Sequence, residues 1–373
     1  MTGLLSTLRR RLGGVAPADA EWAGCPHDFH ALLPAPLFAR LLSLERKRSE
    51  RSRQPFVLML VERPQTATDV ALCELLPSIR ETDIAGWYKD GALGVIFAEL
   101  GAADKASIVE ALRARMTAAL RASLGPAYAD QVRVSFHWFP EDWTGNGTKT
   151  EARTTLYPDL DRRQESRRVS LGVKRAIDAA FSALALIVLS PVLLAIAVAI
   201  RLTSPGPIIF RQERVGQDGV PFTFFKFRSM YAAADQTPHV EFIKKYITEN
   251  ASNNGVYKLT TDSRVTPVGR FLRRTSLDEL PQLFNVLRGE MSLVGPRPPI
   301  RYELEAYDLW HRRRVVEAKP GITGLWQVAG RSRLRFDDMV RLDLAYARGW
   351  SLWLDFKILL RTARVVLSGA GAY

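Results

Sequence analysis

Cysteine and histidine are scarce in this chain of 373 residues, which has two cysteines and five histidines. Two cysteines cannot build a disulfide framework, so the sequence indicates a reducing compartment. Cys25, His27 and His30 are spaced like metal ligands, but a fourth ligand is missing and prolines interrupt the segment, which disfavours zinc there. Residues 1–12 form a short basic amphipathic stretch instead of the apolar core of a secretory signal, so we expect no such signal.

Acidic residues are also few relative to basic ones, with 39 Asp and Glu against 52 Lys and Arg and a net charge of +13. This balance points to anionic partners, namely nucleic acid, acidic lipid headgroups or phosphorylated substrates. A hydrophobic content of 47% excludes a disordered chain. The length allows two domains, each with a core of its own.

Long uncharged apolar runs are limited to one, residues 179–200. A single membrane-crossing helix is the simplest interpretation of such a run. However, Ser190 and Pro191 divide it into arms of about 20 and 17 Å, each too short to cross alone. Basic residues flank both ends, and one crossing would separate the two halves of the chain. We therefore predict a re-entrant helix over 174–203, and we expect the short apolar segment 350–367 to lie in the lipid interface.

Residues 34–140 alternate between helical and strand patterns. The expected order is a helix followed by βαββαβ, a ferredoxin-like split βαβ arrangement. Strands are expected at 56–61, 84–89, 93–98 and 132–138, and helices at 37–52, 67–80 and 103–123. The sequence thus predicts an α/β (α+β) chain with an N-terminal segment (1–33), a first domain (34–140), a polar linker (141–170) and a second domain (171–373).

Two short stretches of the first domain, residues 80–83 (Arg-Glu-Thr-Asp) and 86–88 (Gly-Trp-Tyr), resemble a diguanylate-cyclase (GGDEF-type) domain together with the hairpin that follows. An active cyclase has Gly-Gly-Asp/Glu-Glu-Phe at the hairpin turn, whereas residues 89–93 here read Lys-Asp-Gly-Ala-Leu. The resemblance implies a degenerate domain without cyclase activity that regulates or dimerises the protein. A plain packing domain is the alternative.

The run of residues 273–299 contains the most specific pattern in the chain. Asp278 and Glu279 are adjacent, with an arginine pair before them and a Gly-Pro-Arg-Pro turn that includes Arg297 after them. Acidic groups among fixed cations suit a site that binds a metal and a phosphorylated substrate together. The run therefore predicts a catalytic or binding site.

A purely structural interpretation of the same run is also open. Ser276 and Glu279 have the spacing of a capping box at the start of a helix, and Gly289 suits its C-terminal end. Pro281 weakens this interpretation, because a proline past the first turn removes a helical hydrogen bond.

Two further cations, Lys226 and Arg228, alternate with Phe225 and Phe227. In an extended strand, this alternation packs the aromatic rings on one face and directs both cations to the other. An ordinary half-exposed strand would explain this pattern; the other interpretation, phosphate contacts by both cations, is what the family resemblance given below favours.

Residues 275–298, which include Thr-Ser-Leu-Asp-Glu-Leu-Pro-Gln and Met-Ser-Leu-Val-Gly-Pro-Arg-Pro, resemble the signature of the bacterial sugar transferases, also called monotopic phosphoglycosyl transferases. The resemblance extends from about Lys174 to the end of the chain and includes residues 226–230 and 319–331. It implies an α-rich monotopic catalytic domain with a re-entrant membrane helix broken at Ser190 and Pro191. The implied location is the bacterial inner membrane, with both domains facing the cytoplasm.

The resemblance also implies a reaction. A sugar 1-phosphate passes from a UDP-sugar to polyprenyl (undecaprenyl) phosphate through a covalent aspartyl–phosphosugar intermediate, and UMP is released. This step initiates exopolysaccharide, capsule or glycoconjugate synthesis. By matched position, Asp278 is the nucleophile and a Mg²⁺ ligand, and Glu279 assists it in metal or proton handling. The implied substrate contacts come from Lys226, Arg228, Arg273, Arg297, Arg331 and Asp343.

Besides the UDP-sugar and polyprenyl phosphate, the expected partners are anionic membrane lipids, and a homodimer is left open. Two other functions remain as alternatives. One is a membrane-anchored scaffold that responds to a cyclic dinucleotide through the first domain. The other is a nucleic-acid binder, which only the charge suggests and which leaves the apolar run unexplained. We expect no nucleic-acid partner.

Overall fold

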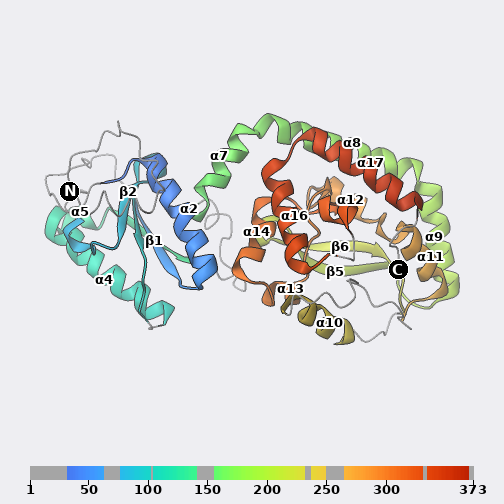
Figure 1. Cartoon of the computed structure of the whole chain (residues 1–373), viewed down its shortest axis with the longest axis horizontal. Coiled ribbons are helices and arrows are strands. Elements are labelled where there is room, and N and C mark those ends of the chain that lie inside the picture. The colour runs from blue at the N-terminus through green and yellow to red at the C-terminus, as the bar shows by residue number, and fades with distance from the viewer. Residues whose placement is uncertain are drawn as a thin grey trace. The chain divides into compact units, whose positions relative to one another are not determined.

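The computed structural model describes residues 32–62, 76–101, 104–140, 155–231, 237–248, 264–330 and 334–368. The chain divides into two compact units, Met1–Asp161 and Arg162–Tyr373, and each combines helices with strands (Figure 1). The boundary falls inside the segment 141–170 that we predicted to be a linker. Part of that segment is helix α7 (Pro158–Ser166), and Leu156, Tyr157 and Leu160 are buried, so hydrophobic burial folds this end of it. Cys25, His27 and His30 lie outside the described residues.

The first unit is built on a four-stranded sheet of order β2-β3-β1-β4 in which every neighbouring pair is antiparallel. This is the strand order of a ferredoxin-like chain, and the four strands agree with the predicted ones. Most of the predicted helix 67–80 lies outside the described residues. The elements are α2 (Ala35–Ser52), β1 (Phe56–Glu62), η1 (Leu76–Ser78), β2 (Ile84–Trp87), η2 (Lys89–Gly91), β3 (Leu93–Phe97), α4 (Lys105–Leu124), α5 (Pro126–Ala129) and β4 (Arg133–Phe139).

Helices cover both faces of this sheet, which explains why β1 is a continuous apolar run. On one face, the Phe38 ring of α2 lies over Gly86 and Gly94, where an added Cβ would come within 2.8 and 2.5 Å of the ring. On the other face, Met116 and Leu120 of α4 share a core with the alternate residues of β1. Both faces are thus occupied by packing within the unit.

The second unit is richer in helix, and its strands form two small sheets, the antiparallel pair β5–β6 and the parallel pair β7–β8. Its elements are α8 (Arg168–Val188), α9 (Ser190–Thr203), β5 (Ile209–Val215), η3 (Gln217–Gly219), β6 (Pro221–Phe227), α10 (Thr237–Thr248), α11 (Pro267–Thr275), η4 (Leu277–Glu279), α12 (Gln282–Arg288), β7 (Ser292–Val294), α13 (Arg301–Glu305), α14 (Leu309–Glu317), β8 (Gly321–Thr323), α15 (Leu325–Ala329), α16 (Phe336–Gly349) and α17 (Leu352–Ser368).

Strand β6 lies between two apolar clusters of the second unit. Phe222 and Phe224 pack with Leu283 and Val286 of α12, whereas Phe227 packs with a cluster from α9 and α11. The strand therefore connects α9 and α11 on one side with α12, which follows Asp278 and Glu279, on the other.

Helices α8 and α9 meet at Ser190 and Pro191 with a bend of 62° (Figure 1). The Ser190 hydroxyl donates to the Ile187 carbonyl oxygen (2.7 Å) at this break. Among the described residues, no single helix has the length and apolarity of a membrane span, although the bent pair reaches them together.

The amphipathic pattern of α8 is inverted relative to a helix of a soluble core. Asp178 and Ser182 of α8 face the protein and are buried. The exposed side is apolar, and its large residues are Val169, Val173, Ile177, Phe181, Leu184, Ile187 and Val188 on α8 and Val192, Leu194, Val198 and Leu202 on α9. A contiguous exposed apolar surface of this kind marks a contact with a membrane or another protein.

Candidate active site

The two adjacent carboxylates meet one lysine. Nζ of Lys226 on β6 lies 3.0 Å from Oδ2 of Asp278 and 3.1 Å from Oε1 of Glu279, both on η4. The Asp278 side chain is 6% exposed, and those of Lys226 and Glu279 are 22% and 27% exposed. The structure thus brings three predicted site residues together, with Asp278 on the inner side and the other two nearer solvent.

The backbone around this cluster differs from the capping-box interpretation, which is wrong. Ser276 is in the left-handed region (φ 58°) and ends α11, so its side chain does not cap a helix that contains Glu279. A 3₁₀ turn follows, and Pro281 precedes the separate helix α12, where its missing N–H costs nothing. The expected end at Gly289 is confirmed by its left-handed conformation (φ 80°).

A close backbone approach sets the distance between η4 and β6. Helix α11 begins with Thr266, whose hydroxyl accepts from the Gly269 amide (2.9 Å). A Cβ on Gly269 would lie 2.0 Å from the Ser229 carbonyl oxygen, so only glycine lets α11 pack directly on the segment after β6. This contact helps to hold the carboxylate turn beside Lys226.

Asn285 is a site residue that was not predicted from the sequence. It is fully buried, its Oδ1 accepts from the Phe225 amide (3.2 Å), and its Nδ2 donates to the Thr223 carbonyl (2.6 Å) and to Glu290 Oε2 (2.7 Å). These bonds join α12 to β6 next to Lys226. A polar residue between the apolar residues Leu283 and Val286 was the available signal.

Arg228 is not brought to the carboxylates. It is buried beyond the end of β6, and its guanidinium donates to the Pro205 carbonyl (2.7 Å) and to the carbonyl and hydroxyl of Ser204 (2.7 and 2.8 Å). These acceptors follow the C-terminal end of α9, so Arg228 holds the end of the bent helix pair. Its position gives no support to the predicted phosphate contact.

Asp343 likewise lies in a structural contact. On α16 and buried, it forms an ion pair with Nη2 of Arg314 on α14 (2.6 Å). Burial raises the pKa of Asp343 to about 6, against the opposing effect of Arg314. Arg314 also donates to the Arg297 carbonyl (3.2 Å), so Asp343 supports the Gly-Pro-Arg-Pro turn indirectly.

For the remaining predicted arginines, the structure gives the position of two, Arg273 and Arg297. Arg273 lies half-buried in the last turn of α11, directly before the carboxylate turn. Arg297 lies half-buried after β7. Arg331 lies outside the described residues.

The carboxylate pair suits a Mg²⁺ ion that is shared with a substrate. Among the described residues, no group of three or more His, Cys, Asp or Glu side chains could hold a metal alone. Mg²⁺ usually binds through one or two carboxylates plus substrate phosphates and water, and Asp278 with Glu279 provide that number.

Comparisons with known proteins place the second unit. Residues 169–369 match the model of a protein family described as "Bacterial sugar transferase". Exopolysaccharide production protein ExoY of Sinorhizobium fredii is 40% identical over 200 residues, which are 54% of this chain and 88% of that protein.

Two longer relatives match the same part of the chain. The galactosyl transferase CpsE of Streptococcus agalactiae is 49% identical over 168 residues, and the undecaprenyl-phosphate galactose phosphotransferase of Salmonella typhimurium is 44% identical over 210. The matches span 45% and 56% of this chain, but only 36% and 43% of those proteins.

Among solved structures, a DGC protein from Thermotoga maritima covers 31% of this chain and 86% of its own, at 18% identity and a TM-score of 0.24. So low a score supports no argument about the first unit. The family match, in contrast, spans more than half of the chain and includes the cluster of Lys226, Asp278 and Glu279. The chain therefore belongs to the bacterial sugar transferase family.

Proposed function

We propose that this chain transfers a sugar 1-phosphate from a UDP-sugar to polyprenyl phosphate and releases UMP, as the initiating step of exopolysaccharide, capsule or glycoconjugate synthesis. The family and the names of the relatives support this reaction class. The single structural observation behind it is the buried Asp278, paired with Lys226, in the same unit as a bent helix pair with an outward apolar surface.

In the first half-reaction, a carboxylate oxygen of Asp278 attacks the phosphorus atom that is bonded to the sugar. The bond from this phosphorus to the bridging oxygen breaks, and UMP leaves with the electron pair of that bond. The product is an acyl phosphate in which the Asp278 carboxylate is bonded to the phosphorus of the sugar phosphate. A carboxylate nucleophile divides one difficult phosphoryl transfer into two easier ones.

In the second half-reaction, an oxygen of polyprenyl phosphate attacks the same phosphorus atom. The bond to Asp278 breaks, which regenerates the carboxylate and yields polyprenyl diphosphate sugar. Each half-reaction breaks one P–O bond for each one formed, so no further reactant is needed.

Lys226 controls access to the nucleophile in this mechanism. Because Asp278 is the innermost member of the cluster, a donor phosphate that approaches it must first meet Lys226 and Glu279. Lys226 then exchanges a carboxylate for the phosphate. Arg273, Arg297 and Arg331 are proposed to neutralise the remaining phosphate charge. A Mg²⁺ held by Asp278, with Glu279 beside it, would add electrostatic stabilisation of the transferring phosphoryl group.

We propose that α8 and α9 enter and leave the membrane by the cytoplasmic face of the inner membrane. Their exposed apolar side chains would lie in lipid, and the bend at Ser190 and Pro191 would return the chain to the same side. Trp353, Phe356 and Leu360 of α17 are exposed as well and suit the interface, where anionic headgroups attract a chain of net charge +13.

The first unit is proposed to be a ferredoxin-like, degenerate GGDEF-like module that does no chemistry, and the strand order β2-β3-β1-β4 supports the ferredoxin-like part. If the alternative of a cyclic-dinucleotide-responsive scaffold were correct, this unit would bind nucleotide while the whole chain released no UMP.

The test is to incubate membranes that contain the protein with several UDP-sugars, polyprenyl phosphate and Mg²⁺, and to measure UMP. Wild-type protein should release UMP with at least one donor, and Asp278→Asn should release none although it still floats with the membranes. Release at the wild-type rate by Asp278→Asn would overturn the assignment of the nucleophile, and no release by wild type with any donor would overturn the reaction.

A further inference from the structure

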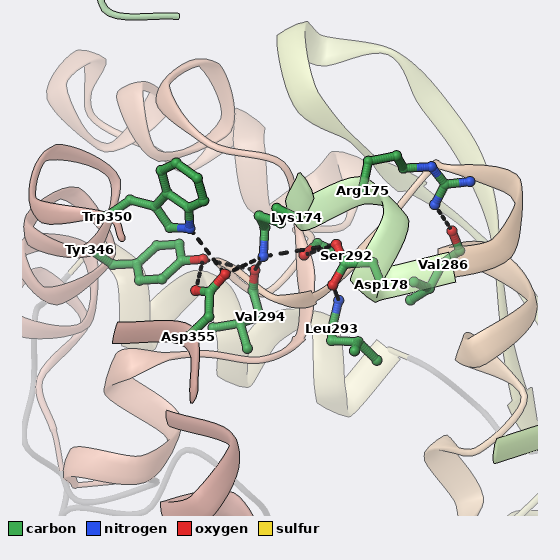
Figure 2. A network of polar contacts seen from close by, with 10 residues as sticks. All are labelled: Lys174, Arg175, Asp178, Val286, Ser292, Leu293, Val294, Tyr346, Trp350 and Asp355. Carbon is green, nitrogen blue, oxygen red and sulfur yellow. Dashed lines mark hydrogen bonds and ion pairs between the residues drawn. The ribbon is translucent and has the colours of Figure 1, made fainter. Parts of the chain in front are cut away.

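One turn of α8 places three charged side chains against the rest of the second unit. Asp178 is buried, and Lys174 and Arg175 are half-buried. We call Lys174, Arg175 and Asp178 the basal turn, because the uncharged apolar run begins at the next residue, Ala179. Figure 2 shows these side chains reaching into the unit, toward residues of β7, α12 and α17.

Toward β7, the basal turn bonds three consecutive residues. Asp178 accepts from the Ser292 hydroxyl (2.7 Å) and from the Leu293 amide (3.3 Å), and Lys174 donates to the Val294 carbonyl (3.3 Å) (Figure 2). Among the described residues, β7 pairs with the short strand β8 alone, so these bonds occupy backbone groups that no second described strand satisfies. The Gly-Pro-Arg turn that contains Arg297 follows β7 directly.

Toward α12, the basal turn holds the other half of the candidate site. Arg175 donates one guanidinium nitrogen to the Val286 carbonyl (2.5 Å) and the other to the Leu287 carbonyl (2.6 Å). Both are carbonyl groups of the last turn of α12, where the regular helical pattern of hydrogen bonds ends; the Val286 carbonyl also accepts from the Gly289 amide (2.9 Å). Helix α12 follows the Asp278–Glu279 turn, and its Asn285 holds β6 beside Lys226.

A third set of contacts keeps Lys174 in place. Its Nζ lies 2.6 Å from Asp355 Oδ2 on α17, and Asp355 also accepts from the Tyr346 hydroxyl (2.7 Å) and the Trp350 indole (3.0 Å) (Figure 2). Burial and the Asp355 charge raise the pKa of Tyr346, so its hydroxyl stays a donor. The Val294 carbonyl, which is also the acceptor that Lys174 uses, lies 2.9 Å from the Tyr346 hydroxyl oxygen and shares its single proton with Asp355.

We propose that the basal turn fixes the relative position of the two halves of the active site, and that Lys174, Arg175 and Asp178 are therefore positioning residues for the transfer reaction. This inference rests on the proposed function. The turn at which α8 enters the lipid is also the turn that holds the segments with Asp278 and Arg297, so membrane insertion and site geometry depend on the same residues.

The experiment compares Asp178→Ala, Arg175→Ala and the gentler Asp178→Asn and Arg175→Lys in the full-length protein in vesicles. Thr362→Val is the matched control, because it removes a partly buried hydroxyl contact between α17 and β8 (Thr323–Thr362, 2.8 Å) and makes no change in β7 or α12. Two quantities are measured for each variant, kcat for UMP release at saturating donor and amide hydrogen exchange over 282–297.

The alanine variants should lower kcat about 10- to 100-fold, which is the effect of small misplacements of reacting groups. The conservative variants should recover part of it, and Thr362→Val should stay within about twofold of wild type. Exchange should accelerate over 291–297 in Asp178→Ala and over 282–289 in Arg175→Ala. The inference would be overturned if the alanine variants had the same kcat as the Thr362→Val control while losing a similar amount of Tm.

The exchange measurement separates this inference from the proposed function, because it needs no turnover. If wild type released no UMP, the reaction would be wrong, and unchanged exchange over 282–297 in the variants would still refute the positioning role. If wild type is active and only the variants fail to differ from the control, the reaction stands and the positioning role is refuted.

Discussion

At the residue scale, Lys226 lies within ion-pair distance of both Asp278 and Glu279. Without it, the two adjacent carboxylates would lose the cation that they share. Removing one partner of a largely buried ion pair costs more than the pair itself contributes, because the other charge stays desolvated.

Replacing this lysine should therefore destabilise the protein through the remaining charges. Lys226→Met is expected to lower the free energy of unfolding by about 2–4 kcal/mol. In Lys226→Met/Asp278→Asn, part of that loss should return, because one of the two charges is gone. Thermal unfolding in detergent measures both, and a double variant less stable than Lys226→Met would contradict the pairing.

His311 on α14 provides a pH-dependent contribution to stability. Its Nδ1 accepts from the Asp308 amide and its Nε2 contacts Asp337 Oδ1, both at 3.0 Å, so a second ring proton has no place on Nδ1. Burial lowers the pKa of His311 from its ordinary value of 6.5, against the raising effect of Asp337. The unfolded chain then binds a proton that the folded chain does not, and stability falls as the pH drops below about 6.5.

His311→Gln should remove this pH dependence and keep the fold, because glutamine at the third helical position can also accept from the N-cap amide. The difference in Tm between wild type and His311→Gln should shrink as the pH is lowered from about 7.5 to about 5.5. Differential scanning fluorimetry at several pH values checks this. A difference that is constant or grows toward acid pH would show that His311 is not held neutral.

At the element scale, the close approach of the segments at the ends of the paired strands β7 and β8 depends on glycines. A Cβ on Gly295 would lie 2.2 Å from the Lys319 carbonyl oxygen and 2.9 Å from the Gly321 amide, and neither backbone group can move alone. This close approach places the turn with Arg297, so a side chain there disturbs both packing and the site.

Gly295→Ala is thus expected to destabilise the second unit by about 3 kcal/mol or more. The matched control is Gly172→Ala in α8, where nothing lies within 4 Å of the added Cβ and the change should stabilise by roughly 0.5–1 kcal/mol. Urea unfolding of the two variants in detergent should move in opposite directions. Equal shifts of the urea midpoint would mean that the backbone near Gly295 can accommodate a side chain.

Local sequence patterns predicted the helices and strands well, but they did not predict contacts between residues that are far apart in the sequence. The strands of the first unit, the bend at Ser190 and Pro191, and the C-terminal glycine of α12 each depend on residues close in sequence. Arg228 contacts Ser204, which is 24 residues away, and Asp343 contacts Arg314, which is 29 residues away. Alternation and spacing do not indicate contacts over such separations. Arg228 also lies one residue past the strand, where the alternation that was applied to it no longer holds.

At the scale of the whole molecule, the re-entrant proposal requires both units to face the same side of the membrane. Arg121 in the first unit and Glu305 in the second are exposed and suit cysteine labelling once Cys25 and Cys73 are replaced by serine. Arg121→Cys and Glu305→Cys should both react with an impermeant thiol reagent only after the cells are lysed. Labelling of one of them in intact cells would show a membrane crossing.

The whole account depends on the claim that Asp278 becomes covalently bonded to the sugar phosphate. The direct measurement is to incubate the purified protein with a UDP-sugar labelled in the β-phosphate, without polyprenyl phosphate, and to locate the label by mass spectrometry. The account predicts label on the peptide that contains Asp278, released when polyprenyl phosphate is added, and none in Asp278→Asn. Unlabelled wild-type protein that still transfers sugar phosphate to the lipid, or equal labelling of Asp278→Asn, would contradict it.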